Sequence, residues 1–117
     1  FIGEGRIAIP VAAGDDDPNA AVYADARARA EAFGLRVVGL PSPGLVFRDG
    51  EIIPASYMNF YIGNAAVVVP LYGAPNDGAA VEAIGALFPG RAVVGFRADH
   101  ILTGGGSFHC ISQQVPV

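Results

Sequence analysis

Val67-Val-Val-Pro-Leu71 repeats the pattern of Ile7-Ala-Ile-Pro-Val11, a stretch near the start of the chain. Each is a short apolar run with a proline near its end, which is typical of a buried strand that leaves its sheet at the proline. Because the same pattern occurs twice in 117 residues, the sequence predicts an internal repeat.

The residues after each strand continue the repeat. Pro18-Asn19 and Pro75-Asn76 mark turns, and each turn is followed by a helical pattern with apolar residues three or four positions apart. Gly34 and Pro89-Gly90 then end these patterns. The residues expected on the apolar helix faces are Val22, Ala26, Ala30 and Phe33 in the first copy and Val81, Ile84, Leu87 and Phe88 in the second.

A second apolar run closes each unit, at Val37–Leu40 and at Val93–Phe96. Strand, helix and strand in this order are typical of an α/β fold. Two such units make a poor closed core, and units of this kind usually stack in larger numbers. Since the chain also begins with Phe1 rather than Met, we expect it to be the C-terminal part of one longer, repeated domain.

The repeat also predicts how the chain is organised: module-like repeats at about residues 6–40 and 65–117 are joined by residues 41–64. Within the joining segment, Arg48-Asp49-Gly50 is typical of a hairpin turn. The remaining expected elements are the hairpin strands Leu45–Phe47 and Glu51–Ile53, a strand at Asn59–Ile62, a short helical turn at Ala98–Leu102 and a last strand at Phe108–Ser112.

Charge and composition exclude several classes of partner. The net charge is −4, and the seven basic residues, all arginine, are scattered from Arg6 to Arg97 without the basic patch that nucleic-acid binding needs. No apolar run approaches the roughly 18–20 residues of a membrane-spanning helix. The single cysteine cannot form an internal disulfide, which favours a cytoplasmic location. Neither CxxC nor His-x-x-x-His spacing occurs, so the sequence predicts no zinc site.

Gly104-Gly-Gly-Ser-Phe-His-Cys110 places this cysteine after three consecutive glycines. A lone cysteine among apolar neighbours is most often an inert, buried residue. Here the glycine backbone can approach a ligand closely, polar residues follow at Ser112–Gln114, and the cysteine lies where a loop meets a predicted strand. These features make Cys110 a candidate catalytic nucleophile, beside the alternative of an inert residue. The candidate substrate-binding residues are Gly105, Gly106 and Ser107.

The two histidines do not supply an evident base for this thiol. If Phe108–Ser112 is extended, the side chains of His109 and Cys110 point to opposite faces of the strand. His100 could reach the loop, but it is expected to be a solvent-exposed histidine at the start of a helix. A base for Cys110 must therefore come from elsewhere in space.

Six stretches of the chain occur together in one order and at natural spacing. They are Ala55–Asn64 (ASYMNFYIGN), Val69-Pro70, Pro75–Asp77, Phe88–Arg91, Val93–Gly95 and Gly104–Gln114 (GGGSFHCISQQ). Together they resemble the C-terminal part of the agmatine deiminases, which are grouped with the bacterial-type peptidylarginine deiminases. The resemblance spans essentially the whole chain and is most specific at GGGSFHCISQQ.

This resemblance implies a fold and a reaction. The fold is an α/β propeller of ββαβ-like modules around a pseudo-fivefold axis, and the chain would supply about two of the five modules. In the reaction, a cysteine thiolate attacks the guanidinium carbon of agmatine and ammonia leaves. Water then hydrolyses the thiouronium adduct to N-carbamoylputrescine, on the route to putrescine. The resemblance implies no metal and no organic cofactor.

The resemblance also implies partners. They are a small guanidine substrate (agmatine), the remaining N-terminal part of the same protein, and a second copy in a homodimer. Asp15-Asp-Asp17 matches an acidic turn of the family, and we expect it to be a solvated loop rather than a ligand site.

Only Cys110 carries over from the catalytic residues of the family, as the nucleophile. The catalytic His-x-Asp motif of the family would precede Phe1, and its other acidic groups would lie further upstream. His109 belongs to the family pattern but is not its general base. Ser107 stands where the family usually has Asn, and Ser112 where it usually has Thr, so the shorter side chain at Ser107 could alter the pocket.

Three alternatives remain open from the sequence. A peptidylarginine deiminase would share the cysteine motif but act on arginine in proteins. A non-catalytic propeller would keep a ligand pocket without the chemistry. A structural α/β domain would bury Cys110 as an inert core residue, so that the native protein would resist thiol labelling.

Overall fold

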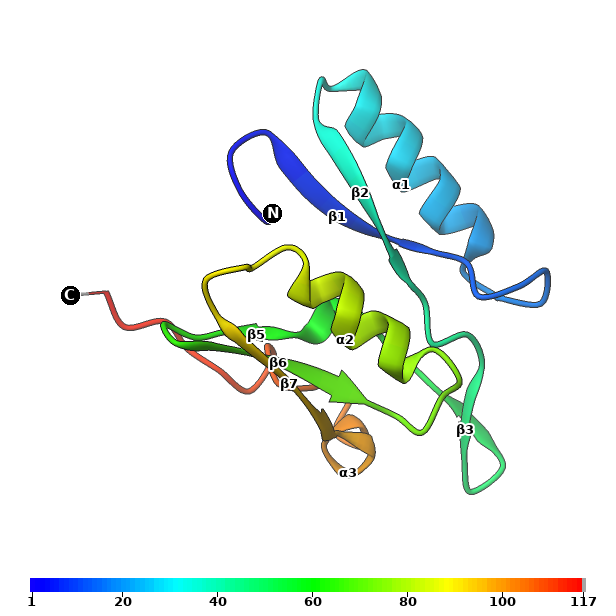
Figure 1. The fold of residues 1–117 in the computed structure, drawn as a ribbon. Helices are drawn as coiled ribbons and strands as arrows, with labels where there is room; N and C mark the ends of the chain where they lie inside the picture. Colours follow the sequence, from blue (N-terminus) through cyan, green and yellow to red (C-terminus); the bar gives the residue numbers. More distant parts are fainter. Residues whose placement is uncertain (117) are drawn as a thin grey trace.

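Two strand–helix–strand units of the same topology make up most of the chain (Figure 1). The computed structural model describes residues 1–116. Its elements are β1 (Arg6–Val11), α1 (Ala20–Ala32), β2 (Arg36–Pro41), β3 (Val46–Arg48), β4 (Glu51–Ile53), the 3-10 helix η1 (Tyr57–Asn59), β5 (Tyr61–Ile62), β6 (Ala66–Leu71), α2 (Asp77–Gly85), β7 (Ala92–Arg97) and α3 (Asp99–Leu102).

Both units form the parallel strand pair that the repeat predicts. β1 pairs with β2 in parallel, and β6 pairs with β7 in parallel, each over six residues. The two strands of each pair are joined through a helix, as parallel strands require. β5 adds an antiparallel strand at the free side of β6, which gives a three-stranded sheet in the order β5-β6-β7. The predicted repeat of strands is therefore confirmed.

Helix α2 lies between the two units and packs against both. It contacts β6 and β7 of its own unit and also β2 of the first unit, and Figure 1 shows it between the two strand pairs. Helix α1, by contrast, contacts only β1 and β2 among the elements that pack extensively together. Helix α2 is therefore a link between the two units, in addition to the contact of β1 with η1.

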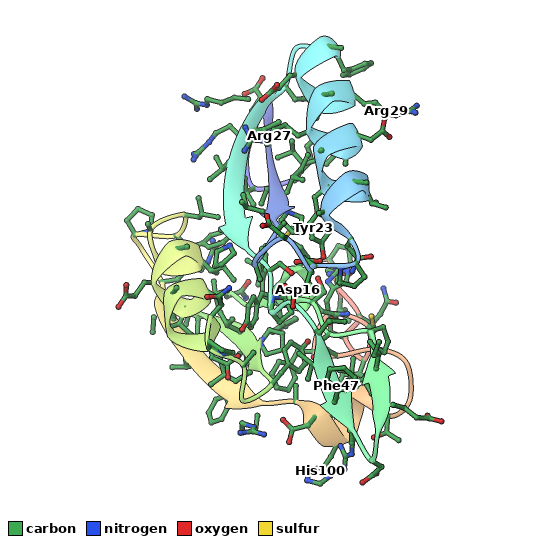
Figure 2. All side chains as sticks on the ribbon, turned by 90° about the vertical axis from the view of Figure 1, so that its right-hand side faces the viewer. Asp16, Tyr23, Arg27, Arg29, Phe47 and His100 are labelled. Atoms are coloured by element: carbon green, nitrogen blue, oxygen red, sulfur yellow. The ribbon has the colours of Figure 1, made fainter. Side chains whose placement is uncertain are left out.

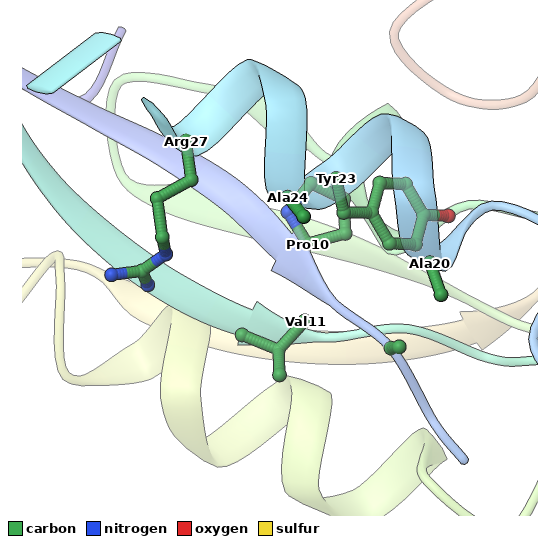
Figure 3. A pocket seen from close by; sticks show the side chains of 7 residues that line it. Pro10, Val11, Ala20, Tyr23, Ala24 and Arg27 are labelled. Atoms are coloured by element: carbon green, nitrogen blue, oxygen red, sulfur yellow. The ribbon is translucent and has the colours of Figure 1, made fainter. Parts of the chain in front are cut away.

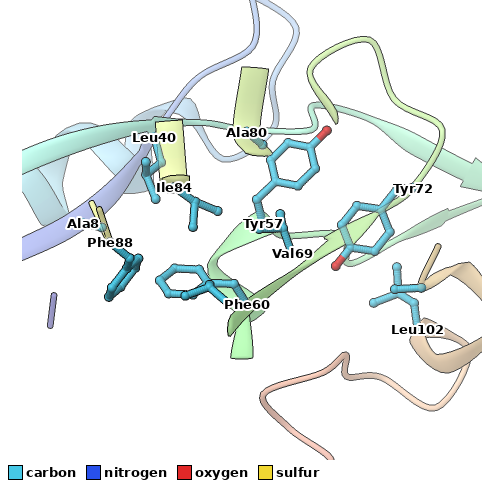
Figure 4. Close-up of a cluster of buried hydrophobic side chains, with 12 residues drawn as sticks. Ala8, Leu40, Tyr57, Phe60, Val69, Tyr72, Ala80, Ile84, Phe88 and Leu102 are labelled. Atoms are coloured by element: carbon cyan, nitrogen blue, oxygen red, sulfur yellow. The ribbon is translucent and has the colours of Figure 1, made fainter. Parts of the chain in front are cut away.

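The hydrophobic core is formed mainly by the second unit (Figure 4). The first unit contributes only Ala8 and Leu40 to the buried cluster. The rings of Tyr57 and Tyr72 lie 5.8 Å apart, and those of Phe60 and Phe88 meet edge to face at 6.0 Å. The buried residues of the cluster are Ala8, Leu40, Tyr57, Phe60, Val67, Val69, Tyr72, Ala80, Ile84, Phe88, Ala98 and Leu102.

The predicted inner face of α1 is wrong in part. Val22 and Phe33 are 64% and 84% exposed, and α1 has no buried residue. The side of the helix nearest the strands carries Tyr23 and Arg27, whose positions on α1 are shown in Figure 2. Arg27 lines a cavity there together with Pro10, Val11 and Tyr23.

A shallow cavity remains between α1 and the end of β1 (Figure 3). Its volume is about 250 Å³, and Val11, Tyr23 and Arg27 are among the residues that line it. The helix is thus less closely packed than α2, in which Ala80 and Ile84 are fully buried.

Helix α2 is shorter than the spacing of its apolar residues predicts. It ends at Gly85, so the predicted face residues Leu87 and Phe88 come after the helix, in a turn where the Phe88 N–H donates to the Gly85 carbonyl at 3.1 Å. Phe88 nevertheless reaches the core, where its ring meets that of Phe60 edge to face at 6.0 Å.

The joining segment largely follows the prediction. β3 and β4 form the expected antiparallel hairpin, and Asp49 and Gly50 both have positive φ angles (51° and 84°), as a two-residue turn of this kind requires. The predicted strand Asn59–Ile62 is wrong in its first half, since Asn59 ends the 3-10 helix and only Tyr61–Ile62 pair with β6. The helical turn expected at Ala98–Leu102 is confirmed by α3.

The last predicted strand, Phe108–Ser112, is wrong. This segment forms turns, in which the Ile111 N–H donates to the Ser107 carbonyl at 3.2 Å and the Ser112 N–H donates to the His109 carbonyl at 3.1 Å. The Ser112 hydroxyl adds a bond of 2.8 Å to the same His109 carbonyl. These local bonds use the backbone groups that a strand would offer to a sheet. The alternation of strand faces therefore says nothing about the side chains of His109 and Cys110.

The position of α2 predicts that its buried face stabilises the whole chain. Replacing Ile84 with Ala should lower the free energy of unfolding by about 2–5 kcal/mol, because it leaves a cavity in the shared core. Glu82→Ala, on the exposed side of the same helix, is the matched control and should change stability by no more than about 0.5 kcal/mol. Urea denaturation of the chain measures both values, and equal effects would contradict this account of the core.

Candidate active site

Cys110 lies on a tight loop that begins with the glycines after α3. Its thiol is free and exposed. A Cβ atom added at Gly106 would lie 2.7 Å from the Cβ of Cys110 and 3.1 Å from its Sγ. No side chain fits at such a distance, so the glycine at this position lets the loop fold back onto the cysteine. Within residues 1–116, Cys110 is therefore not part of the buried core.

The side-chain amide of Asn59 holds the cysteine from the other side. Its Oδ1 accepts a hydrogen bond from the Cys110 backbone N–H at 3.1 Å, and its Nδ2 donates to the Cys110 Sγ at 3.0 Å. The backbone carbonyl of Asn59 also accepts from the His109 N–H at 3.1 Å. Three hydrogen bonds thus join the end of η1 to residues 109 and 110, although these segments lie far apart in the chain.

A second set of contacts fixes the direction of η1. The Ser56 hydroxyl accepts from the Met58 N–H at 3.2 Å and so caps the 3-10 helix. The Tyr72 hydroxyl donates to the Ser56 carbonyl at 3.0 Å. Burial raises the pKa of Tyr72, so its hydroxyl stays protonated and remains a donor. Because η1 ends at Asn59, these bonds determine where the Asn59 amide points.

The carboxylate of Asp77, the first residue of α2, anchors both tyrosines. Its Oδ1 accepts from the Tyr57 hydroxyl at 2.7 Å, and its two oxygens each lie 3.2 Å from the Tyr72 backbone N–H. Its Oδ2 also accepts from the Gly73 N–H at 2.8 Å. Burial and the bond to Asp77 raise the pKa of Tyr57, so this phenol also remains a donor. A chain of contacts therefore runs from α2 through the tyrosines to the thiol.

The immediate surroundings of the thiol favour its ionised form. Hydrogen bonds from the Ser107 backbone N–H and from the Asn59 side chain lower the pKa of Cys110, and they outweigh a small opposing effect of burial. Both donors are neutral. A thiolate is the nucleophilic form of cysteine, so the loop increases the reactive fraction of Cys110 near neutral pH.

The three candidate substrate-binding residues occupy different environments. Gly106 lies directly against Cys110. Gly105 is exposed, has a φ of 87°, and lines a cavity of about 290 Å³ whose lining also includes Arg48 and Leu102 but not Cys110. Ser107 is fully buried, and in residues 1–116 its hydroxyl has no hydrogen-bond partner. Their contact with substrate stays a prediction.

Neither histidine is hydrogen-bonded to the thiol in the part of the chain that the structure describes. His109 is exposed, and its backbone N–H donates a hydrogen bond to the Asn59 carbonyl. His100 is exposed on α3, as expected, and its Nδ1 lies 2.9 Å from the Arg48 Nη2. Within residues 1–116, neither histidine is therefore placed as a hydrogen-bonded base for the Cys110 thiol.

The acidic turn Asp15-Asp-Asp17 is solvated only in part. Asp15 and Asp16 are exposed, but Asp17 is 5% exposed and accepts from the N–H groups of Ala13 and Asn19, both at 3.0 Å. The expectation of a fully solvated loop is thus wrong for Asp17. It organises the turn before α1, and Asp77 makes similar bonds to backbone N–H groups from the first position of α2.

Two further features concern the whole described chain. Within residues 1–116, no cluster of three or more His, Cys, Asp or Glu side chains is placed to hold a metal ion. Among the same residues, no helix is both long enough and apolar enough to cross a membrane.

Sequence reasoning missed Asn59 as a functional residue. The residue lies within ASYMNFYIGN, one of the stretches that carry the family resemblance, but neither its type nor its spacing indicates a contact with Cys110. The position of Asn59 in that stretch was the only available signal.

Comparisons with known proteins agree with this geometry. The family model for Porphyromonas-type peptidyl-arginine deiminase matches residues 1–116. A Listeria monocytogenes protein provisionally named agmatine deiminase 1 is 52% identical over 68 residues, which cover 58% of this chain and 19% of that protein. The chain therefore spans only about a fifth of the length of this curated relative.

Solved structures show the same fold. The agmatine deiminase of Enterococcus faecalis, described as catalyzing its reaction, is 33% identical with a TM-score of 0.87, and the match covers 99% of this chain and 38% of that one. A cysteine-to-serine variant of the C. jejuni agmatine deiminase with substrate bound is 25% identical with a TM-score of 0.84, covering 93% of this chain and 33% of that one. The fold is thus a partial α/β propeller of the deiminase type, as the resemblance implies.

The hydrogen bond between Tyr57 and Asp77 should contribute measurably to stability. Tyr57→Phe removes the donor and leaves the half-buried Asp77 carboxylate with one partner fewer, so we expect a loss of about 1.5–3 kcal/mol. Tyr61→Phe is the matched control, because the Tyr61 hydroxyl has no hydrogen bond within residues 1–116, and it should be nearly neutral. Thermal and urea unfolding measure both, and a neutral Tyr57→Phe would show that the bond is not a major support.

The close contact at Gly106 predicts a strong effect of one added methyl group. Gly106→Ala should lower the free energy of unfolding by about 1–3 kcal/mol, since the Cβ must displace the Cys110 side chain. Gly78→Ala, at a helical position with open space around it, should leave stability unchanged or raise it by about 0.4–1 kcal/mol. If Gly106→Ala behaved like Gly78→Ala in urea denaturation, the loop would not be packed as described.

Proposed function

The chain belongs to the Porphyromonas-type peptidyl-arginine deiminase family, and from this premise we propose that it is the C-terminal part of an agmatine deiminase in which Cys110 is the nucleophile. The observation that carries the proposal is the exposed thiol of Cys110, whose sulfur accepts a hydrogen bond from the Asn59 Nδ2 at 3.0 Å. Relatives from three bacteria whose names contain agmatine deiminase support the choice of substrate.

The proposed reaction proceeds in two steps. The Cys110 thiolate attacks the guanidinium carbon of agmatine, a C–S bond forms, and the C–N bond to a terminal nitrogen breaks to release ammonia. Water then adds to the thiouronium carbon, the C–S bond breaks, and N-carbamoylputrescine leaves while the thiol is restored. A guanidinium is a delocalised cation that resists attack, so it needs a thiolate together with carboxylates that hold it and a proton donor for the leaving nitrogen.

Those further groups must come from the rest of the polypeptide. We propose that residues 1–117 are the C-terminal part of one deiminase domain, with module-like repeats at 6–40 and 65–117 joined by 41–64. The N-terminal remainder would supply the histidine and the acidic residues. Gly105, Gly106 and Ser107 would border the substrate, and the whole enzyme would work in the cytoplasm as a homodimer without a metal or organic cofactor.

A second candidate is a peptidylarginine deiminase, favoured by the description of the matching family. It would use the same chemistry at Cys110 on the side chain of an arginine in a protein. The two candidates differ in what lies beyond the guanidinium group, either a short aminobutyl chain or a polypeptide backbone, and therefore in the shape of the pocket entrance.

The test is ammonia release from agmatine and from an arginine-containing peptide by the complete polypeptide. We expect turnover of agmatine that falls by at least about 10³-fold in Cys110→Ala, because no other described group replaces the thiolate. Turnover of the peptide alone would assign the protein to the second candidate. No turnover of either compound by the folded protein would favour a non-catalytic binding propeller.

The same assay can be applied to the 117-residue chain without the rest of the polypeptide. It should release no ammonia, since in this proposal the acid, base and guanidinium-holding groups lie in the N-terminal remainder. Deimination by the purified chain would contradict the proposal that the N-terminal remainder supplies groups that the reaction requires.

A further inference from the structure

The hairpin β3–β4 is joined to α3 by the guanidinium group of Arg48. Its Nη1 donates to the backbone carbonyl of Asp99, and its Nη2 lies 2.9 Å from the Nδ1 of His100. Figure 2 shows His100 at the end of the molecule where the hairpin lies, marked there by Phe47 on β3. Among the elements that pack extensively together, β3 and β4 contact only each other. Arg48 therefore supplies a long-range link between the hairpin and the segment that leads to the thiol.

The contact between Arg48 and His100 requires a neutral imidazole. A guanidinium group has only donors, so the Nδ1 of His100 must accept, and the ring proton is assigned to Nε2. A proton on Nδ1 would place a donor and a second positive charge against Arg48. Histidine side chains normally gain this proton between about pH 8 and pH 5, so the link is present above that interval and is lost below it.

Several other charged groups surround this link. Asp49, in the hairpin turn, lies 4.0 Å from the Arg48 Nε, and Glu51 is opposite Arg48 in the hairpin. On the other side, the Asp99 carboxylate accepts from the Arg97 Nε at 2.8 Å, and this bond lowers the pKa of Asp99. Asp99 therefore stays ionised and paired with Arg97 when the imidazole gains its proton. Histidine is the one side-chain type in this group that normally changes charge in that interval.

Helix α3 leads directly into the loop of Cys110. It has only four residues, and a helix this short is not stable without tertiary contacts. Its last residue, Leu102, is buried in the core. The turn that follows is built on the last carbonyls of α3. The Gly104 N–H donates to Ile101 at 3.0 Å, and the Gly105 N–H donates to Leu102 at 2.8 Å. The direction of α3 therefore sets where the glycine loop begins.

A cavity of about 290 Å³ lies between the hairpin and this loop, because residues of both line it. Arg48 lines it from the hairpin, and Leu102, Thr103 and Gly105 line it from the end of α3 and the loop. Apolar packing between the two segments is thus incomplete, since atoms that face a void have no contact partner there. The hydrogen bonds of Arg48 accordingly carry more of the connection.

We propose that Arg48 is a positioning residue for the nucleophile, which holds α3 and the start of the Cys110 loop only while His100 is neutral. The proposal rests on the proposed function, because the place of this loop matters for catalysis only if Cys110 is the nucleophile. Acidification releases Arg48 from α3, loosens the glycine turn and leaves the thiol less well placed for attack. A displacement of about 1 Å in a reacting group can cost about 10²-fold in rate.

The first measurement is hydrogen–deuterium exchange of the complete polypeptide near pH 8, read by mass spectrometry on a peptide that contains Gly104 and Gly105. Their N–H groups are bonded to carbonyls of α3, so their exchange reports whether the end of the helix is held. Arg48→Ala should speed this exchange by about tenfold or more. Arg48→Lys keeps the charge but not the planar fork, so it should have a smaller effect in the same direction.

Arg91→Ala is the matched control for this exchange. Arg91 also lies against the folded chain, with its guanidinium 5.6 Å from the centre of the Phe88 ring, but it is not bonded to α3 within residues 1–116. It should leave the exchange of Gly104 and Gly105 unchanged. Equal exchange in Arg48→Ala and Arg91→Ala would overturn the proposal. If Arg48→Ala fails to fold, Arg48→Lys takes its place in the comparison.

The pH dependence of agmatine turnover separates positioning from general stability. His100→Asn keeps an acceptor near the place of Nδ1 but cannot gain a proton. As the pH falls from about 8 to about 5.5, kcat of the unmodified protein should fall faster than kcat of His100→Asn. The ratio of the two should rise by about threefold or more, while the ratio of KM values changes by no more than about twofold. A ratio of kcat that stays constant would contradict the role of His100 and overturn the proposal.

The two measurements distinguish failure of this inference from failure of the proposed function. If the unmodified protein does not turn over agmatine, the proposed function fails, but the exchange of Gly104 and Gly105 still shows whether Arg48 holds α3. If agmatine is turned over, kcat of Arg48→Ala near pH 8 should be lower by about tenfold, with KM changed by no more than about twofold. Faster exchange with an unchanged kcat would mean that the place of the loop does not matter, and only the role of Arg48 would be wrong.

Discussion

The carboxylate of Asp77 is the interaction on which the arrangement of the site depends. It accepts hydrogen bonds from the backbone where β6 ends and from the hydroxyl of Tyr57 in η1, so one side chain fixes a helix, a strand end and a 3-10 helix relative to one another. Tyr72 then holds Ser56, the cap of η1, and η1 presents Asn59. The thiol is thus oriented by the packed core and not by the flexibility of its own loop.

The two units share a topology but differ in packing. Helix α2 has apolar contacts on both sides, whereas α1 lies beside its strands with exposed Val22 and Phe33. An aspartate accepts backbone hydrogen bonds near the start of each helix, Asp17 before α1 and Asp77 at the first position of α2, but only Asp77 also binds a buried tyrosine. The unit with the more complete core is therefore the one that supports Cys110, which fits the requirement that a reactive group be held by rigid surroundings.

Local patterns in the sequence predict the repeated part of the fold well, because alternation and helical spacing report directly on burial within one element. They also single out Cys110, since a thiol after three glycines is unusual. They fail where burial depends on distant residues: the inner face of α1, and the end of the chain, where side-chain and turn hydrogen bonds replace a sheet partner. The contact between Asn59 and Cys110 joins residues from two irregular segments, so no periodicity could indicate it.

The central claim is that Cys110 forms a covalent bond with the guanidinium carbon of agmatine. The most direct measurement is to quench the complete polypeptide with acid during turnover of agmatine and to locate any thiouronium adduct by peptide mass spectrometry. The account predicts an adduct on Cys110 that forms together with released ammonia and is absent from the Cys110→Ser variant. An adduct on a different residue, or full turnover in Cys110→Ser, would contradict it.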